Sequence, residues 1–504
     1  MQGPRYRVGA VLPAAPVLPA APHLLARLAT LTVWAVIGAL PATAQVPAPL
    51  TLDAARELAA ARAVDVLAAE RDARVANLEV ARLEADLRPQ VRLDATVPSF
   101  LRSFRETVQP DGTVRFQPVT INNFSVRLAA SQAFAATGGT LQLSTGLQRF
   151  DDFEQDLKIY NGSVARLGYS QPLWGFNALK WDRQVLPLRD REATARLAAT
   201  RREAAFTATL RFFDLAAAQL AYQIADSNAV ASERLLAIAE ERYALGKVSR
   251  GDLVQLELEG ADARQNRLRA QQVWLGATAE FYALVGEPFG GEPLPVVEPE
   301  LEAAGAVDVD DALARAARQR PEALARTRRL LEAESQLGFD RRENGFRADL
   351  TASLGLIRSD PELPEVYADP QLEQVVELRL SVPIVDWGRR RAIVAQSEPE
   401  LVLAEALGER ELLDLATRTR LAAEQANRSR AELDLLRRVR DLAEERYRIS
   451  RESYVLGAVP LTELTLAQQA RDQRLRQYLG GLQNAYTAYA QLNALTLHDY
   501  LSNG

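Results

Sequence analysis

The strongest constraint on the fold is an internal repeat at a constant offset of 211 residues (381 minus 170). Pro172 and Gly246 correspond to Pro383 and Gly457, with no gap between the proline and the glycine in either copy. Chance similarity of alanine-rich helices is the alternative, but it does not explain proline and glycine at equal spacing. The chain therefore reads as a duplication. Further matched positions are Ser170/Ser381, Glu241/Glu452, Tyr243/Tyr454, Leu245/Leu456, Val248/Val459, Asp252/Glu463 and Leu253/Leu464.

A weaker match marks where each copy begins. Leu52-Asp53-Ala54-Ala55 resembles Val309-Asp310-Asp311-Ala312, and each opens a run rich in alanine, arginine and leucine. A proline-rich stretch lies between the copies and is typical of a linker. We divide the chain into a first repeat at 45–285, a linker at 286–306 and a second repeat at 307–504.

The first 44 residues have the features of a signal peptide. Three arginines and no acid precede Asp53, Leu28 to Leu40 is apolar, and Ala42-Thr43-Ala44 is a small-residue cleavage motif before Gln45. A membrane anchor is the alternative, but a spanning helix needs about 20 apolar residues. Residues 1–44 are therefore predicted to be removed on export.

Charge and cysteine content narrow the class of protein. Without the three arginines of the leader, 57 basic residues (60 minus 3) face 66 acidic ones, a net charge of −9. An acidic chain of this kind is not expected to bind nucleic acid. Cysteine is absent, which excludes disulfides, thiolate chemistry and a lipidated N-terminal cysteine.

Two segments are too long and too regular for ordinary globular helices. No proline or glycine occurs between Pro187 and Gly246, and apolar residues there follow a heptad pattern. From just after Pro172 to Gly246 the pattern predicts a helix of about 65–70 residues, roughly 100 Å long. Pro187 and Pro399 are expected to mark a kink or the start of each helix. An ordinary coiled coil has the same pattern.

Each long helix is predicted to turn back on itself. Gly246 and Gly457 are expected as left-handed C-caps, and Asp252 and Thr462 as N-caps of the returning helices. Each repeat would then hold a long helical hairpin, with tips at 246–252 and 457–463.

The segments before each repeated proline alternate with a period of two. Val91, Leu93, Ala95 and Val97 alternate with polar residues, and the same holds around Leu350–Leu356 and Val376–Val382. This pattern fits a soluble sandwich as well as a lipid-facing barrel with a wet lumen. Aromatic residues favour the barrel, because Trp174 and Trp387 occupy equivalent junctions where an interfacial girdle belongs. Packing in a soluble core is the alternative for these aromatics.

The barrel strands are expected at about 90–172 and 347–384, with at least two in each repeat and about four in the chain. Four strands cannot close a barrel, and open edges are not tolerated in lipid, so oligomerisation is required. Three chains would supply about twelve strands. Residues 98–160 are expected to add a hairpin around Thr137-Gly138-Gly139-Thr140 or an extracellular loop, and 359–374 to form an external loop.

The order of helix, strand pair and long helical hairpin, repeated twice, resembles the TolC-like outer-membrane efflux protein family. The most specific motifs are Gln171-Pro172-Leu173-Trp174-Gly175, Ser381-Val382-Pro383-Ile384-Val385-Asp386-Trp387-Gly388 and the two glycine-ended tips. The resemblance implies a mainly α-helical chain with a membrane β-barrel, forming a homotrimer with a twelve-stranded barrel and a periplasmic α-helical tunnel. It also implies a passive exit duct for efflux or type I secretion, opened at its tip by a periplasmic adaptor and an inner-membrane pump.

The resemblance also assigns residues to roles. Glu463 would ring the periplasmic aperture, with Leu466 where a second acid occurs in other members, and Tyr454 and Asp252 would hold the tip closed. Val459 replaces the arginine of that clamp. A solvated acid at a helix N-terminus is the alternative for Glu463. Adaptor contacts at the tips would be Gly246, Val248, Leu253, Gly457, Val459 and Leu464, and the barrel–helix junctions would be Pro172, Trp174, Pro383 and Trp387.

Two other classes of protein remain as alternatives. An enzyme is disfavoured, because the only histidines are His23 and His498 and no nucleotide, cofactor or metal motif is present. A periplasmic coiled-coil adaptor or scaffold would share the helices, but it would not need duplicated amphipathic strand pairs.

Overall fold

The computed structural model describes residues 46–108, 111–301 and 306–501. The chain separates into a unit of residues 1–47 and a unit of residues 48–504, and every helix and strand named below belongs to the second. The predicted signal peptide at 1–44 lies outside the described residues.

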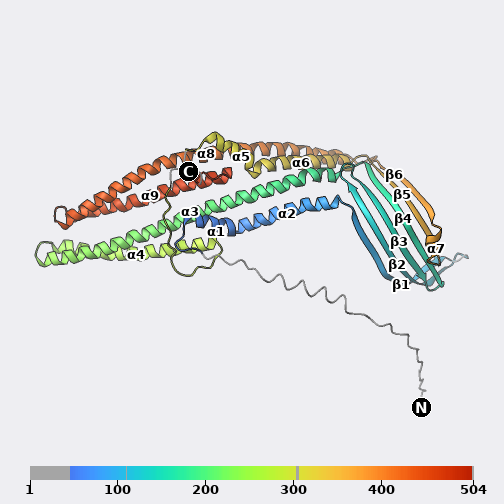
Figure 1. Cartoon of the computed structure of the whole chain (residues 1–504), viewed down its shortest axis with the longest axis horizontal. Coiled ribbons are helices and arrows are strands. Elements are labelled where there is room, and N and C mark those ends of the chain that lie inside the picture. The colour runs from blue at the N-terminus through green and yellow to red at the C-terminus, as the bar shows by residue number, and fades with distance from the viewer. Residues whose placement is uncertain (1–45, 109–110, 302–305, 502–504) are drawn as a thin grey trace, which may run out of the picture. The chain divides into compact units, whose positions relative to one another are not determined.

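The helices of the two repeats occur in the same order and have nearly equal lengths (Figure 1). Each repeat has two shorter helices, then a long helix, then a returning helix. In the first repeat these are α1 (Leu52–Arg62), α2 (Val64–Asp86), α3 (Ala178–Ala244) and α4 (Arg250–Leu284). In the second repeat they are α5 (Val309–Gln319), α6 (Pro321–Glu343), α8 (Arg389–Val455) and α9 (Leu461–Thr496).

The long helices confirm the predicted length, since α3 and α8 have 67 residues each. The prolines do not start them. Pro187 and Pro399 lie inside α3 and α8, about one seventh of the way along. The starts are set instead by Asn177, whose side chain accepts a hydrogen bond from the amide of Lys180 at 3.1 Å, and by Gly388, which has a positive φ of 87°.

The strands form one antiparallel sheet of six, in the order β1-β2-β3-β4-β5-β6 (Figure 1). Their bounds are β1 Gln90–Val108, β2 Val114–Phe134, β3 Gly139–Asp152, β4 Leu157–Trp174, β5 Arg347–Asp360 and β6 Gln371–Ser381. The expectation of about four strands per chain is therefore wrong for this sheet. The first repeat contributes four strands and the second contributes two, and the hairpin expected around Gly138 and Gly139 is confirmed as the β2–β3 turn. The short helix α7 (Glu365–Ala368) lies in the segment between β5 and β6.

The extra strands account for a change in the repeat offset. Before the sheet, α1 and α5 begin 257 residues apart (309 minus 52), whereas after it α3 and α8 begin 211 apart (389 minus 178). The first repeat thus carries 46 more residues (257 minus 211) in its strand segment. That length is enough for one more hairpin of strands at the usual 3.3 Å per residue.

The pairing of the strands places apolar and polar side chains on opposite faces of the sheet. Leu143 of β3 pairs with Leu167 of β4, and Leu354 of β5 lies beside Leu167 on the same face. The opposite face holds polar residues, and a hollow on it is lined by Asp94, Arg127 and Arg166 among others. The period of two therefore places apolar side chains on one face and polar ones on the other, as predicted.

Long aromatic side chains fill the middle of the helical region. Phe212 and Phe213 of α3 are fully buried, and the Phe213 ring lies 5.6 Å from that of Tyr486 in α9. Alanines 422, 423 and 426 of α8 pack in the neighbouring cluster around Tyr489. Within the described residues, none of the helices is apolar enough over a sufficient length to cross a membrane.

Candidate functional site

The two helical tips are built by the same backbone device. At the first tip the amide of Lys247 donates to the carbonyl of Arg242 at 2.9 Å, and Gly246 has a φ of +70°. At the second tip Ala458 donates to Ser453 at 2.9 Å, and Gly457 has a φ of +77°. This pattern satisfies the last carbonyls of a helix and needs a left-handed residue, so the predicted glycine caps are confirmed.

The predicted N-caps of the returning helices are wrong by a few residues. Ser249 caps α4, and Asp252 is the third helical residue, whose carboxylate closes a capping box with Ser249. Pro460 occupies the N-cap of α9, with no side-chain hydrogen bond, and Thr462 lies inside the helix. The sequence signal Ser-x-x-Asp at 249–252 could have identified the first cap.

The predicted adaptor contacts at the tips divide by burial. Gly246 and Gly457 are exposed, and Val248 and Val459 are half-buried. Leu253 and Leu464 are buried at 5% and 2% exposure, and each packs in the core of its own hairpin. A partner cannot reach these two leucines without opening the tip, because they are already covered by the chain itself.

The two hairpins contact each other near their tips. Leu235 of α3 packs against the core of both hairpins, and Leu461 of α9 packs against that of the first. A guanidinium nitrogen of Arg242 donates to the carbonyl of Val455 at 2.9 Å, and further along the side chain of Asn228 donates to Asp472 at 2.7 Å. The first and second repeats are therefore joined at the tips within one chain.

The three predicted gating residues lie near this junction but are not bonded to one another. Asp252 accepts hydrogen bonds from Ser249. Burial is the main cause that raises the pKa of the Tyr454 phenol, and Asp252 is close enough to add to the rise, whereas Arg242 opposes it. Glu463 is exposed in the first turn of α9, and no hydrogen bond holds its carboxylate within the described part of the chain. The tyrosine–aspartate clamp suggested by the resemblance stays a prediction.

A groove of about 990 Å³ runs beside the tips, between α3 and the α8–α9 hairpin. Its floor is partly apolar, with Val230 and Leu235, and its rim carries Arg234, Glu444 and Arg451. Sequence reasoning missed this groove, because it is formed by helices more than 200 positions apart.

The predicted barrel–helix junctions are the points where β4 and β6 meet the long helices. Pro172 and Trp174 lie at the end of β4, and the Trp174 ring is 6.1 Å from Phe346, next to the start of β5. Pro383 follows the end of β6, and Trp387 has a φ of +53° and is 95% exposed. Large exposed aromatics at this level are typical of a membrane interface and are not explained by packing within the chain.

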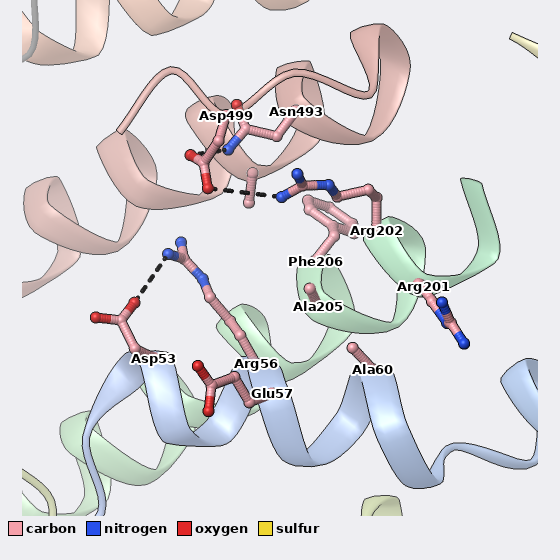
Figure 2. A pocket seen from close by; sticks show the side chains of 11 residues that line it. Asp53, Arg56, Glu57, Ala60, Arg201, Arg202, Ala205, Phe206, Asn493 and Asp499 are labelled. Carbon is pink, nitrogen blue, oxygen red and sulfur yellow. Dashed lines mark hydrogen bonds and ion pairs between the residues drawn. The ribbon is translucent and has the colours of Figure 1, made fainter. Parts of the chain in front are cut away.

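A second pocket, of about 410 Å³, joins the repeats at the middle of the helices (Figure 2). In it Arg56 of α1 contacts Asp53, and Arg202 of α3 contacts Asp499 near the C-terminus, at 3.7 and 3.5 Å. Asn493 also donates to Asp499 at 3.0 Å. Three acids therefore lie among three arginines where α1, α3 and the end of α9 meet.

Comparison with known proteins finds one family similar to part of this chain. The sequence model of the outer membrane efflux proteins matches residues 343–496, which is most of the second repeat. No curated protein matches the sequence.

Solved structures match over the length of the helices and sheet. CusC is 15% identical with a TM-score of 0.61, covering 88% of this chain and 91% of its own. The Campylobacter jejuni outer-membrane channel CmeC is 14% identical with a TM-score of 0.62, covering 88% and 85%. The Neisseria gonorrhoeae outer-membrane channel MtrE, in its open state, is 16% identical with a TM-score of 0.56, covering 88% of each chain. The second repeat is thus similar in sequence to the outer membrane efflux proteins, and the chain shares the fold of these solved structures.

Proposed function

We propose that three copies of this protein form the exit duct of a tripartite efflux system, with a β-barrel in the outer membrane and an α-helical tunnel in the periplasm. The similarity of the second repeat to the outer membrane efflux proteins supports an outer-membrane efflux channel. The trimer and its partners are the proposal.

The observation that carries the proposal is the polarity of the sheet. Leu354, Val376 and Leu378 lie on one face and are 48–77% exposed, while the opposite face carries Glu373, Glu377 and Arg379. Burying this apolar face in lipid removes it from water at a gain of roughly 25 cal/mol per Å². The polar face then lines a wet lumen.

The tips supply the regulated end of the duct. An α-helical hairpin of a periplasmic adaptor would fit the groove beside Leu235, because the groove combines an apolar floor with a charged rim. Glu463 carboxylates from three chains would surround the aperture, favouring cations over anions. Opening would require the contact between Arg242 and Val455 to break.

A periplasmic adaptor or scaffold is not favoured by any of these features. Such a protein would have no use for an exposed apolar sheet face continuous with the helices. The similarity to outer membrane efflux proteins favours efflux. No feature of the described residues separately favours the secretion of proteins through the same duct.

Two adjacent residues of β5 test the proposal. Leu354 points to the apolar face and Ser353 to the polar face. Leu354→Arg should sharply reduce the amount of trimer that stays with outer membranes after carbonate washing, because an arginine at mid-membrane on the lipid side costs about 2–4 kcal/mol. Ser353→Arg is the matched control and should assemble normally and conduct in planar bilayers. A wild-type protein that stayed a soluble monomer without detergent, and carried no current, would overturn the duct.

A further inference from the structure

We propose that the trimer closes as an eighteen-stranded barrel, in which β6 of each chain pairs with β1 of the next in a register set by the internal repeat. This inference rests on the proposed trimer. It replaces the twelve strands expected from the sequence with a wider barrel.

The two outer strands of the sheet are the open edges. β1 pairs only with β2, and β6 pairs only with β5, within the described residues. The inner strands β2 and β3 are paired on both sides over most of their lengths, so they cannot leave the sheet without losing those ladders. In lipid an unpaired edge is costly, and therefore all six strands belong to the closed wall.

The repeat shows how one edge fits the other. The halves of one chain meet at β4 and β5, where the last strand of the first repeat pairs with the first strand of the second. β4 corresponds to β6 by the offset of 211, and β5 corresponds to β1 by the offset of 257. A β6–β1 contact between chains is therefore the repeat equivalent of the β4–β5 contact within a chain.

This equivalence gives a register. Ser170 faces Thr351, and Tyr169 faces Ala352, across β4 and β5. Shifting each by its offset places Ser381 opposite Asp94 of the partner chain, and Leu380 opposite Ala95. The polarity agrees, because Leu380 and Ala95 lie on the apolar face, while Ser381 and Asp94 lie on the polar face.

Charges in this register are also compatible. Arg379 falls opposite Thr96 and diagonal to Asp94 of the partner chain, within reach for a favourable cross-strand pair. A simple alignment of Gln90 with Ser381 would instead place Asp94 opposite Glu377 and Arg92 opposite Arg379. Like charges directly opposite each other are destabilising.

The number of strands sets the diameter of the barrel. With strands about 4.8 Å apart and tilted by about 40°, twelve strands close at a backbone diameter of roughly 24 Å and eighteen at roughly 36 Å. The extra hairpin is tied to the start of α3, since Asn177 donates to the carbonyl of Ala135 at 2.9 Å. It is also tied to β4, since Gln171 donates to the carbonyl of Thr137 at 2.8 Å. The wider barrel thus stays joined to the tunnel.

Paired cysteines test this register, and the natural chain contains no cysteine that could interfere. Ser381→Cys with Asp94→Cys should give disulfide-linked dimers and trimers on oxidation in outer membranes. Ser170→Cys with Thr351→Cys, the equivalent pair within one chain, should oxidise without any linked oligomer. Ser381→Cys with Ala95→Cys, which point to opposite faces, should give at least tenfold less linked oligomer.

The alternative barrel has its own cysteine pair. In a twelve-stranded barrel made from β3 to β6, the neighbour of β6 is β3. The same repeat argument, with β3 equivalent to β5, places Ser144 opposite Ser381, so Ser381→Cys would link to Ser144→Cys. Linkage of that pair, or of neither pair, in samples that run as trimers on native gels would overturn the eighteen-stranded barrel and leave the duct intact. Absence of any native trimer would instead overturn the proposed function.

Discussion

The two helical tips are repeat equivalents that differ in how they hold their acidic residue. At the first tip Ser249 and Asp252 form a capping box, which binds the Asp252 carboxylate. At the second tip Pro460 stands where Ser249 would be, and it offers no side-chain hydrogen bond to Glu463. Both carboxylates are exposed, but this one substitution leaves Glu463 without the side-chain hydrogen bond that Asp252 has.

The equivalent tyrosines of the two tips also differ, in how far each is buried. Tyr454 at the second tip packs against the cluster of Tyr447 and Leu464, whereas its equivalent Tyr243 at the first tip is 42% exposed. The tips therefore differ in how the acid and the tyrosine are held, although both share the backbone hydrogen bonds and each buries its leucine. A duplicated element has acquired two different ways of ending.

The largest effect should come from the buried leucines. Leu464→Ala and Leu253→Ala each remove a side chain that is at most 5% exposed, and each should destabilise its tip by about 2–5 kcal/mol. Hydrogen exchange of the tip amides measures this. The exposed Leu466→Ala is the control and should change little. If only one leucine mattered, the two hairpins would not be equivalent in packing.

A smaller effect on tip stability is expected from the N-cap residues, Ser249 at the first tip and Pro460 at the second. Ser249→Ala should cost the first tip about 1 kcal/mol, because the amide of Asp252 loses its acceptor. Pro460→Ser should stabilise the second tip by supplying the missing cap. Protease cleavage rates at the two tips compare them directly, and equal rates in all variants would contradict a role for the cap.

Cation selectivity should depend on the second tip only. Glu463→Ala should lower the cation-to-anion permeability ratio by about twofold, or ~0.4 kcal/mol at 1.4 kcal/mol per tenfold. Reversal potentials in single-channel recordings provide the measurement. Asp252→Asn is the matched variant at the first tip, and its carboxylate is already engaged by Ser249. Unchanged reversal potentials for Glu463→Ala would remove the acidic aperture.

The smallest effect should appear at alkaline pH. Burial raises the pKa of Tyr454, so the folded tip favours the neutral phenol more than the unfolded chain does. The stability from this difference is present below the ordinary tyrosine pKa of about 10 and is lost as pH rises through the higher folded value. Tyr454→Phe should remove this loss, and Tyr243→Phe should keep it. Tip hydrogen exchange across that pH range would reveal the difference.

The sequence by itself determined the local periodicities, the repeat and the glycine-capped tips. These follow from neighbouring residues, since a left-handed cap needs glycine wherever it occurs, and a period of two or of 3.5 residues is visible without knowing the partner. The lengths of α3 and α8 were predictable for the same reason.

The tertiary structure decided how many strands share the sheet and which tip residues are covered. A period of two does not reveal where a long strand segment turns back, because both four and six strands satisfy it. Leu253 and Leu464 look like surface contacts in sequence, but each is buried in the core of its own hairpin, to which one leucine of the other hairpin adds. Such outcomes depend on contacts between residues some 200 positions apart, which no local pattern records.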